Sequence, residues 1–144
     1  MTIKAAIVGA AGFAGIELVR LLVQHPSFEL IAMTSDAYAG EPVASVYPAF
    51  AGSVDLAFSA TADAPLADAD VVFLAVPHTV ALKHAPDLVA AGVAVIDLSA
   101  DFRLKDPEAY AAYYGVAHTA PDLLAEAAFG QPELFPEDLA RVRQ

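Results

Sequence analysis

The 144-residue sequence contains no cysteine. This absence excludes disulfide bonds, zinc–thiolate sites and a thiol nucleophile within the chain. No stretch approaches the about 20 uninterrupted apolar residues that a membrane span requires. The first residues also lack the basic segment and long apolar block of a signal peptide. We therefore expect a cytoplasmic domain with no membrane partner.

Basic residues are scarce. Seven Lys and Arg face 18 Asp and Glu, which gives a net charge of −11. A nucleic-acid partner is not expected, because its phosphate backbone demands basic patches. Distant charges are screened beyond about 8 Å at physiological salt, so a helix terminus can still bind an anionic cofactor locally. The overall acidity is expected to serve solubility.

The chain is instead rich in apolar residues. They make up 58% of it, and the mean hydropathy is +0.54. These values exclude general disorder. The length suits a single domain with one substantial core.

The sequence is organised around its first eighteen residues. Residues 4–8 are an apolar run of β-formers, residues 9–15 read Gly-Ala-Ala-Gly-Phe-Ala-Gly, and residues 16–24 are good helix formers. A glycine turn between a strand and a helix is the context of a dinucleotide-binding site, where the free N–H groups of the first helical turn face the phosphates. The G-x-x-G-x-x-G spacing alone is a weak signal, because small residues also recur at such turns for packing.

Each glycine has an expected task in a dinucleotide-binding turn. Gly9 lets the backbone turn sharply off the strand, and Gly12 has no Cβ to hold a pyrophosphate away. Gly15 allows the helix to lie close to the sheet.

Further strands and helices are expected to alternate along the chain. Apolar strands that alternate with helices predict an α/β fold with a doubly wound, mostly parallel sheet of the Rossmann type. The sixth strand of that fold is missing from the sequence. Thr79 is expected to cap the helix over 80–91 and Gly92 to end it. The expected strands are 4–8, 29–34, 54–58, 71–76 and 93–98, and the later helices cover 107–114, 123–129 and 136–142.

Ligands of such folds bind at the carboxyl ends of the strands, which here carry small or polar residues. After the second strand, an acid suits the ribose 2′-hydroxyl of NAD, whereas small hydroxyls and a base suit the phosphate of NADP. Thr34, Ser35 and Asp36 follow that strand. The two hydroxyls favour NADP and the carboxylate opposes it, so composition leaves the choice open.

Several stretches together resemble the N-acetyl-gamma-glutamyl-phosphate reductases of arginine biosynthesis. The most particular are the run Asp-Leu-Ser-Ala-Asp-Phe-Arg at 97–103 and Tyr-Tyr-Gly at 113–115 followed by His118. The resemblance covers the whole chain, including residues 8–18, 72–78 and 129–133.

The resemblance implies an NADPH-dependent oxidoreductase that reduces N-acetyl-glutamyl 5-phosphate to the semialdehyde and releases phosphate. In the family, a cysteine forms the thioester intermediate and a histidine acts as acid and base, and both lie beyond the stretch that this chain matches. Residues 1–144 are accordingly expected to be the cofactor-binding domain, with the catalytic α+β domain absent, no catalytic residue and no turnover of its own. The full enzyme is expected to be a homo-oligomer acting on a small acyl phosphate.

Two residues depart from the family pattern, which often has serine at the position of Ala11 and arginine at that of Asp36. Other functions stay open as well. They are a non-catalytic NAD(P)-binding regulatory module and a related acyl-phosphate reductase, of the lysine carrier-protein pathway or the aspartate-semialdehyde type.

The candidate site contains no metal ligand set. Ser99 and Ala100 are expected to approach the nicotinamide end, and Arg103 to bind substrate phosphate or carboxylate, or else to pair with Asp97 or Asp101. The candidate cofactor-binding residues are Gly9, Ala10, Ala11, Gly12, Phe13, Ala14, Gly15, Thr34, Ser35, Ala75, Val76, Pro77, His78, Ser99 and Ala100.

Other polar and aromatic residues have simpler expected roles. Asp101 is expected to organise its loop, and His78 either contacts cofactor or forms only a local hydrogen bond. His118 is expected to shape the substrate side. Surface positions are expected for His25 and His84, core positions for Tyr110, Tyr113 and Tyr114, and a helix C-terminus for Arg141 and Arg143.

Overall fold

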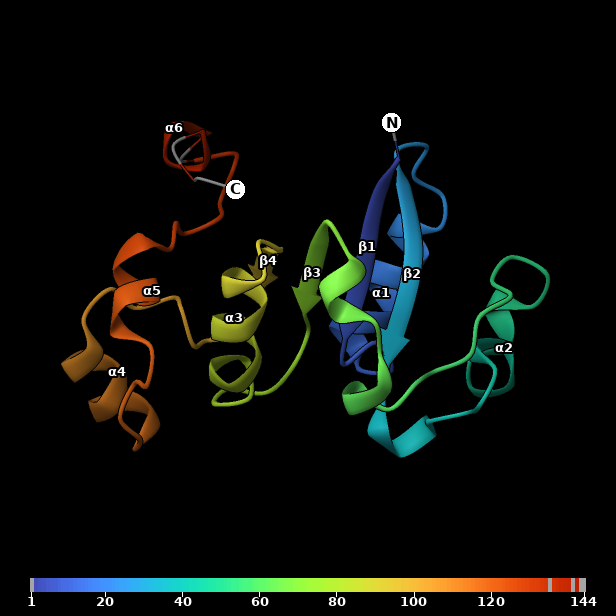
Figure 1. Cartoon of the computed structure of the whole chain (residues 1–144), viewed down its shortest axis with the longest axis horizontal. Coiled ribbons are helices and arrows are strands. Elements are labelled where there is room, and N and C mark those ends of the chain that lie inside the picture. Colours follow the sequence, from blue (N-terminus) through green and yellow to red (C-terminus); the bar gives the residue numbers. More distant parts are fainter. Residues whose placement is uncertain (1, 135, 141, 143–144) are drawn as a thin grey trace.

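The computed structural model describes residues 2–134, 136–140 and 142. Its centre is a four-stranded sheet in the order β2-β1-β3-β4, in which every neighbouring pair is parallel (Figure 1). Because β1 lies between β2 and β3, the sheet extends from β1 in one direction through β2 and in the other direction through β3 and β4. This switch point is where open α/β sheets bind ligands. The strands are β1 (Ile3–Val8), β2 (Phe28–Thr34), β3 (Val71–Leu74) and β4 (Ala94–Asp97).

The helices α1 (Phe13–Leu22) and α3 (Ala81–Ala90) cover opposite faces of the sheet. Successive strand residues point to opposite faces, so Ile7 packs in one cluster with Val19 of α1, and Val8 in another with Leu88 of α3. Both clusters are closed to solvent, which explains the unbroken apolar runs of β1 and β3. The predicted doubly wound parallel architecture is confirmed.

The predicted strand over residues 54–58 is wrong. Only isolated bridges form there, between Thr34 and Ser59 and between Pro42 and Ala57. The N–H of Phe58 donates to the carbonyl of Glu41, so this segment pairs with the loop before it and cannot continue along β2. The loop contains α2 (Val43–Val46) and the short 3₁₀ turns Asp36–Tyr38, Pro48–Phe50, Thr61–Asp63 and Leu66–Asp68.

The starts of α1 and α3 differ from the prediction. The first helix begins at Phe13, inside the glycine turn, and not at residue 16. Thr79 does not cap α3, because the N-cap is Val80 and its side chain forms no capping bond. Thr79 itself has a positive φ of 71°, and the carboxylate of Asp101 caps the helix instead, as described below.

The last third of the chain lies at one end of the molecule, beyond β4 and α3 (Figure 1). It holds α4 (Pro107–Tyr114), α5 (Pro121–Glu126) and α6 (Pro136–Leu139). The predicted cap of α4 is confirmed, since the Asp106 carboxylate accepts from the N–H of Glu108 at 2.9 Å, and Gly115 ends the helix in a left-handed conformation. Helix α5 begins and ends earlier than the predicted 123–129, and α6 ends before the predicted 142. The expectation for Arg141 and Arg143 lies outside the described residues.

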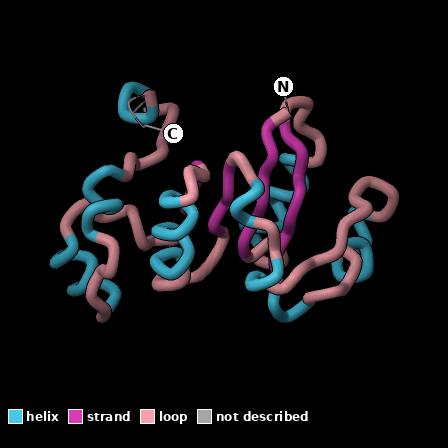
Figure 2. Tube along the Cα trace, viewed as in Figure 1, coloured by secondary structure: helices cyan, strands magenta, loops and turns pink. Residues whose placement is uncertain are grey.

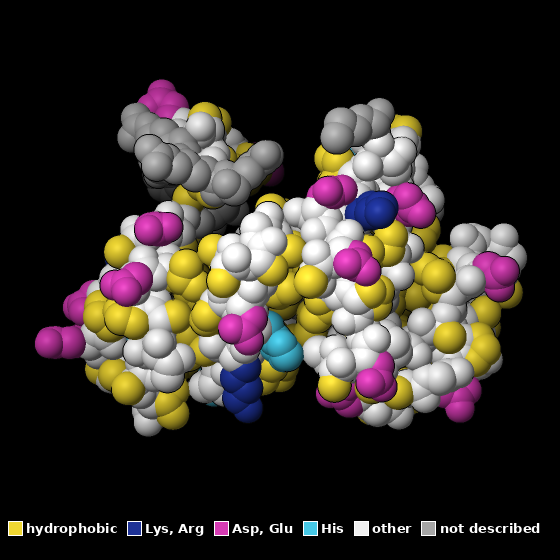
Figure 3. Space-filling model, viewed as in Figure 1, with side chains coloured by type: hydrophobic (Ala, Val, Ile, Leu, Met, Phe, Trp, Pro, Cys, Tyr) yellow, Lys and Arg dark blue, Asp and Glu magenta, His cyan; other side chains and the backbone are white. Residues whose placement is uncertain are grey.

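The strands gather in the middle of the molecule, with helices and irregular segments on either side (Figure 2). In the part of the chain that is described, no helix has the length and apolar character needed to cross a bilayer. On the face shown in Figure 3, acidic side chains are spread over all parts and form no single patch.

Candidate functional site

The glycine turn is fixed at the switch point by contacts from both neighbouring strands. The N–H of Ala10 donates to the carbonyl of Thr34 at 2.8 Å, and the N–H of Gly9 donates to the Thr34 hydroxyl at 3.4 Å. On the other side, the N–H of Ala75 donates to the carbonyl of Val8 at 2.9 Å. The ends of β1, β2 and β3 therefore meet around the turn.

Gly9 and Gly15 are required by packing within the protein. Gly9 has a φ of +82°, and a Cβ there would lie 2.4 Å from the Ala75 carbonyl oxygen. A Cβ at Gly15 would lie 2.2 Å from the Gly9 carbonyl oxygen. Both distances are far inside van der Waals contact, so the close approach of helix to sheet depends on these two glycines.

Gly12 has no such internal requirement. Its φ is −76°, and a Cβ there would meet the Gly9 carbonyl oxygen at 3.4 Å, an ordinary contact. The missing Cβ instead leaves the outer side of the turn open. This is the cradle that a pyrophosphate would need.

The start of α1 offers unpaired backbone donors beside this cradle. Among the described residues, the N–H groups of Ala11, Phe13, Ala14 and Gly15 have no hydrogen-bond partner, whereas that of Gly12 donates to Gly9. No acidic side chain lies in the first turn to occupy them. A helix start with free N–H groups carries partial positive charge and suits a phosphate. Phe13 projects from the same turn with 97% of its surface exposed.

Tyr47 supports the turn from the loop after β2. Its hydroxyl donates to the carbonyl of Ala11, so this carbonyl of the turn has a partner within the protein. This contact could not be foreseen from the sequence, because Tyr47 lies 36 residues further along the chain.

Thr34, at the end of β2, was expected to contact the cofactor, but its side chain points into the protein. Its side chain is fully buried, and its hydroxyl accepts from Gly9 and from the Thr61 hydroxyl at 3.0 Å. Thr34 thus holds the turn in place and presents no hydroxyl outward. Ser35 is half-buried and Asp36 is exposed, with the Asp36 carboxylate accepting from the N–H of Thr61 at 2.8 Å.

The segment after β3 follows the glycine turn around the same edge. Ala75 and Val76 are half-buried, whereas Pro77 and His78 are exposed. The His78 ring lies against Tyr114, with ring centroids 5.5 Å apart. Among the described residues, His78 has no hydrogen-bond partner, so the local hydrogen bond foreseen as an alternative is absent.

The loop after β4 is tied together by hydrogen bonds between its own residues. The Asp97 carboxylate accepts from the N–H of Ser99 at 2.8 Å and from its hydroxyl at 2.9 Å. Burial raises the pKa of Asp97 above its ordinary value, and the two bonds from Ser99 oppose that rise. The guanidinium of Arg103 donates to the Ser99 carbonyl at 3.1 Å.

Arg103 forms no ion pair with Asp97 or Asp101. The structure gives one ion pair in the described part of the chain, between Arg20 and Glu17. The Arg103 side chain is exposed and uses one of its five donors on Ser99. The remaining donors are free to meet an anion, whereas the alternative of a loop-fixing salt bridge is not found.

Asp101 is fully buried and receives three donors. One carboxylate oxygen accepts from the N–H of Thr79 and from the Tyr110 hydroxyl, each at 2.7 Å. The other accepts from the N–H of Leu82 at 3.2 Å. These bonds agree with the expectation that Asp101 organises its loop, and they extend its reach to α3 and α4.

His118 closes the same cluster. Its Nε2 lies 2.8 Å from the carbonyl oxygen of Asp101, and its Nδ1 accepts from the N–H of Ala120 at 3.2 Å. Since a carbonyl only accepts and that N–H only donates, these two partners select the Nε2–H tautomer. The ring is buried, so His118 supports the loop from inside.

The other histidines and tyrosines divide between core and surface. Tyr110 is fully buried as expected, but Tyr113 is 81% exposed, so its predicted core position is wrong. Tyr114 is half-buried beside His78. His25 is exposed as expected, whereas His84 is half-buried on α3.

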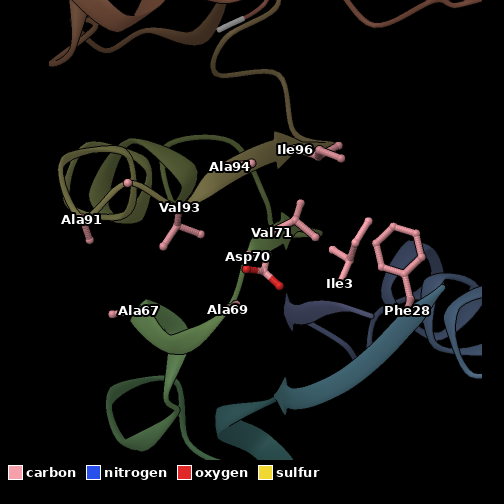
Figure 4. A pocket seen from close by; sticks show the side chains of 11 residues that line it. Ile3, Phe28, Ala67, Ala69, Asp70, Val71, Ala91, Val93, Ala94 and Ile96 are labelled. Atoms are coloured by element: carbon pink, nitrogen blue, oxygen red, sulfur yellow. The ribbon is translucent and has the colours of Figure 1, made fainter. Parts of the chain in front are cut away.

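A cavity of about 500 Å³ opens at the opposite edge of the sheet. Ile3, Asp70, Val71 and Ala94 line it, together with Ile96 of the outer strand (Figure 4). Except for Ile96, these residues lie at or next to the amino ends of their strands, whereas the glycine turn follows the carboxyl end of β1. The cavity is therefore separate from the candidate site. Within the described residues, no three His, Asp or Glu side chains gather as a metal site requires.

Comparison with known proteins gives a consistent family. The family model "Semialdehyde dehydrogenase, NAD binding domain" matches residues 4–142. The chain is 51% identical over 98% of its length to an N-acetyl-gamma-glutamyl-phosphate reductase of Janthinobacterium sp. (strain Marseille). It is likewise 51% identical to the reductase of that name from Bordetella pertussis. It spans about two fifths of the length of these curated relatives, 41% and 40%.

Solved structures share the fold at low sequence identity. Aspartate semialdehyde dehydrogenase II from Vibrio cholerae superposes with a TM-score of 0.71 at 18% identity, covering 97% of this chain and 35% of that one. The Candida albicans aspartate semialdehyde dehydrogenase, solved with NADP, gives a TM-score of 0.62 at 23% identity over 82% of this chain and 40% of that one. These likenesses show the architecture alone.

Proposed function

The chain belongs to the semialdehyde dehydrogenase family through its NAD-binding domain, and on that premise we propose that it is the NADP(H)-binding domain of an N-acetyl-gamma-glutamyl-phosphate reductase. The observation that carries the proposal is the glycine turn. Gly12 lacks a packing reason to be glycine, and the free N–H groups beside it at the start of α1 suit a phosphate. The identity of about half the residues to named reductases supports the choice of enzyme.

The residues of this chain bind and orient the cofactor. The turn from Gly9 to Gly15 takes the pyrophosphate, Ser35 faces the adenosine ribose, and the segments 75–78 and 99–100 border the nicotinamide side. Thr34 acts from the interior by holding Gly9. When bound, NADPH supplies the hydride for reduction of the acyl group.

We assign substrate binding to Arg103. Its exposed guanidinium carries donors in a planar fork that matches phosphate or carboxylate. The full reductase is proposed to act on the small acyl phosphate N-acetyl-glutamyl 5-phosphate as a homo-oligomer. These 144 residues contain no cysteine, so they are proposed to bind cofactor without turning over the acyl phosphate. NADPH oxidation with the acyl phosphate by this chain alone would contradict that assignment.

The choice of cofactor is tested by titrating the chain with NADPH and NADH in parallel. We expect tighter binding of NADPH. The Asp36→Asn variant is expected to strengthen NADPH binding by about threefold to tenfold, since removing one partly screened charge near a phosphate changes the free energy by about 1 kcal/mol. NADH binding should change little.

Asp63→Asn is the matched control for this test. Asp63 is exposed in the 3₁₀ turn Thr61–Asp63 and its side chain forms no hydrogen bond with a described residue. It carries the same charge, so its removal changes the net charge equally. Tighter binding of NADH than NADPH by the unmodified chain would reject the NADP assignment, and binding of neither would reject the dinucleotide site.

A further inference from the structure

Thr79 is a backbone outlier at the edge of the candidate site. Its φ of 71° is the only positive value among non-glycine residues in the described part of the chain. A β-branched residue in this conformation is uncommon, and such strain persists only where the surrounding structure enforces it. Thr79 directly follows Pro77 and His78, which belong to the proposed nicotinamide side.

The enforcing group is the carboxylate of Asp101. It accepts from the N–H of Thr79 at 2.7 Å and from that of Leu82 at 3.2 Å. It therefore fixes the bend and also serves as the N-terminal cap of α3, which no neighbouring side chain supplies. The sequence predicted that the Thr79 side chain would cap this helix. The carboxylate of Asp101, from a different loop, takes that role, and its bond to the Thr79 N–H holds Thr79 in the left-handed conformation.

Asp101 is itself held rigidly. Tyr110 of α4 donates its hydroxyl to the same carboxylate oxygen, the Ser99 hydroxyl accepts from the Asp101 N–H at 3.1 Å, and His118 contacts its carbonyl. Burial and the bond to Asp101 raise the pKa of Tyr110, which keeps its hydroxyl available as a donor. Every part of Asp101 is thus fixed by a second group.

The structure assigns to Asp101 the role of a positioning residue that holds the Pro77–His78–Thr79 bend against the cofactor. The assignment rests on the proposed dinucleotide site. Asp101 links the loops after β3 and β4, so that both loops are held in place at the cofactor site before the cofactor binds. Such pre-organisation improves affinity because less ordering remains to be done on binding.

The test combines Asp101→Ala with substitutions at Thr79. Asp101→Ala is expected to raise the Kd for NADPH about tenfold, the loss expected for one charge-assisted hydrogen bond acting through the loop. Glycine adopts a positive φ at no cost. Adding Thr79→Gly to Asp101→Ala should therefore restore the Kd to within about threefold of the unmodified chain.

Two controls separate positioning from simple destabilisation. Thr79→Val keeps the branched side chain and should give no rescue in the Asp101→Ala background. Asp106→Ala removes the cap of α4 and lowers stability elsewhere in the same region, so it should leave the Kd unchanged. Rescue by valine as well as glycine, or no rise in Kd with Asp101→Ala, would overturn the assignment.

A second readout follows the Thr79 backbone directly. In the free chain, the Thr79 amide is expected to exchange slowly with solvent and to show the NMR scalar coupling of a positive φ. Fast exchange, or a negative φ that becomes positive only with NADPH, would overturn the assignment. If the chain binds no dinucleotide, the proposed function fails, while this readout, repeated on Asp101→Ala, still decides whether Asp101 holds the bend.

Discussion

A methyl group added at Gly12 separates the ligand role of the glycine turn from its packing role. At Gly12 the new Cβ would lie 3.4 Å from the nearest backbone atom of the protein, the Gly9 carbonyl oxygen. It would project into the open cradle beside the free N–H groups of α1. The same change at Gly15 would place the Cβ 2.2 Å from that oxygen and 2.6 Å from Ala10 Cα. Gly12→Ala and Gly15→Ala are thus a matched pair with opposite expected effects.

The expected magnitudes follow from these contacts. Alanine is a poorer N-cap than glycine by about 0.5–1 kcal/mol, and its lower entropy in the unfolded chain offsets about 0.4–1 kcal/mol. Gly12→Ala should therefore change the free energy of unfolding by less than about 1 kcal/mol. Gly15→Ala forces the backbone to move and should cost about 3 kcal/mol or more. The pyrophosphate displaced by Gly12→Ala would lose one or two charge-assisted hydrogen bonds, which weakens binding about tenfold to a hundredfold.

The assay is a fluorescence titration with NADPH, paired with urea unfolding of each variant. Weakened binding by Gly12→Ala with an unchanged unfolding midpoint is the expected result. If Gly12→Ala binds NADPH as tightly as the unmodified chain, the pyrophosphate does not lie over Gly12, and the reasoning from the open cradle is refuted. If Gly15→Ala unfolds at the same urea concentration as the unmodified chain, the argument from close packing is refuted.

Three further predictions concern polar side chains that are buried or half-buried. Thr34→Val leaves the Gly9 N–H without its acceptor and should lower the free energy of unfolding by about 1–3 kcal/mol in urea titrations, and no loss would mean that the 3.4 Å bond contributes nothing. Burial raises the pKa of Asp97 above 3.8, so this group's contribution to the free energy of unfolding should fall as pH rises from 3.8 through the folded-state pKa. Carbon-13 NMR titration of the Asp97 carboxyl checks this, and a pKa below 3.8 would contradict it. Tyr110→Phe removes a donor from the buried Asp101 carboxylate and should cost about 2 kcal/mol in urea unfolding, whereas an equal midpoint would exclude that bond as a source of stability.

Features that depend on neighbouring residues were predictable from the sequence. The strand, glycine turn and helix at the start of the chain follow from local propensity and from the steric freedom of glycine. The start of α4 at Asp106 and Pro107 and its end at Gly115 follow from capping rules of the same kind. Each of these rules acts over a few residues, so no knowledge of the tertiary fold was needed.

The errors arose where distant segments compete for the same backbone groups. Residues 54–58 have the composition of a strand, but the bond between Phe58 and Glu41 takes the groups that a sheet would need. Thr79 has the side chain of an N-cap, but the carboxylate of Asp101 caps α3 in its place. Propensity alone cannot decide such competitions, because the outcome depends on which loops meet.

The sequence by itself determined the family, the alternation of strands and helices, and the turn that the proposed cofactor would occupy. The tertiary structure alone decided that Thr34 faces inward to hold Gly9, that Tyr47 supports the turn, and that Asp101 joins two loops. The physical reason is the separation of the partners. Hydrogen bonds across 22 to 36 residues form only after the parallel strands have brought their carboxyl ends to one edge of the sheet.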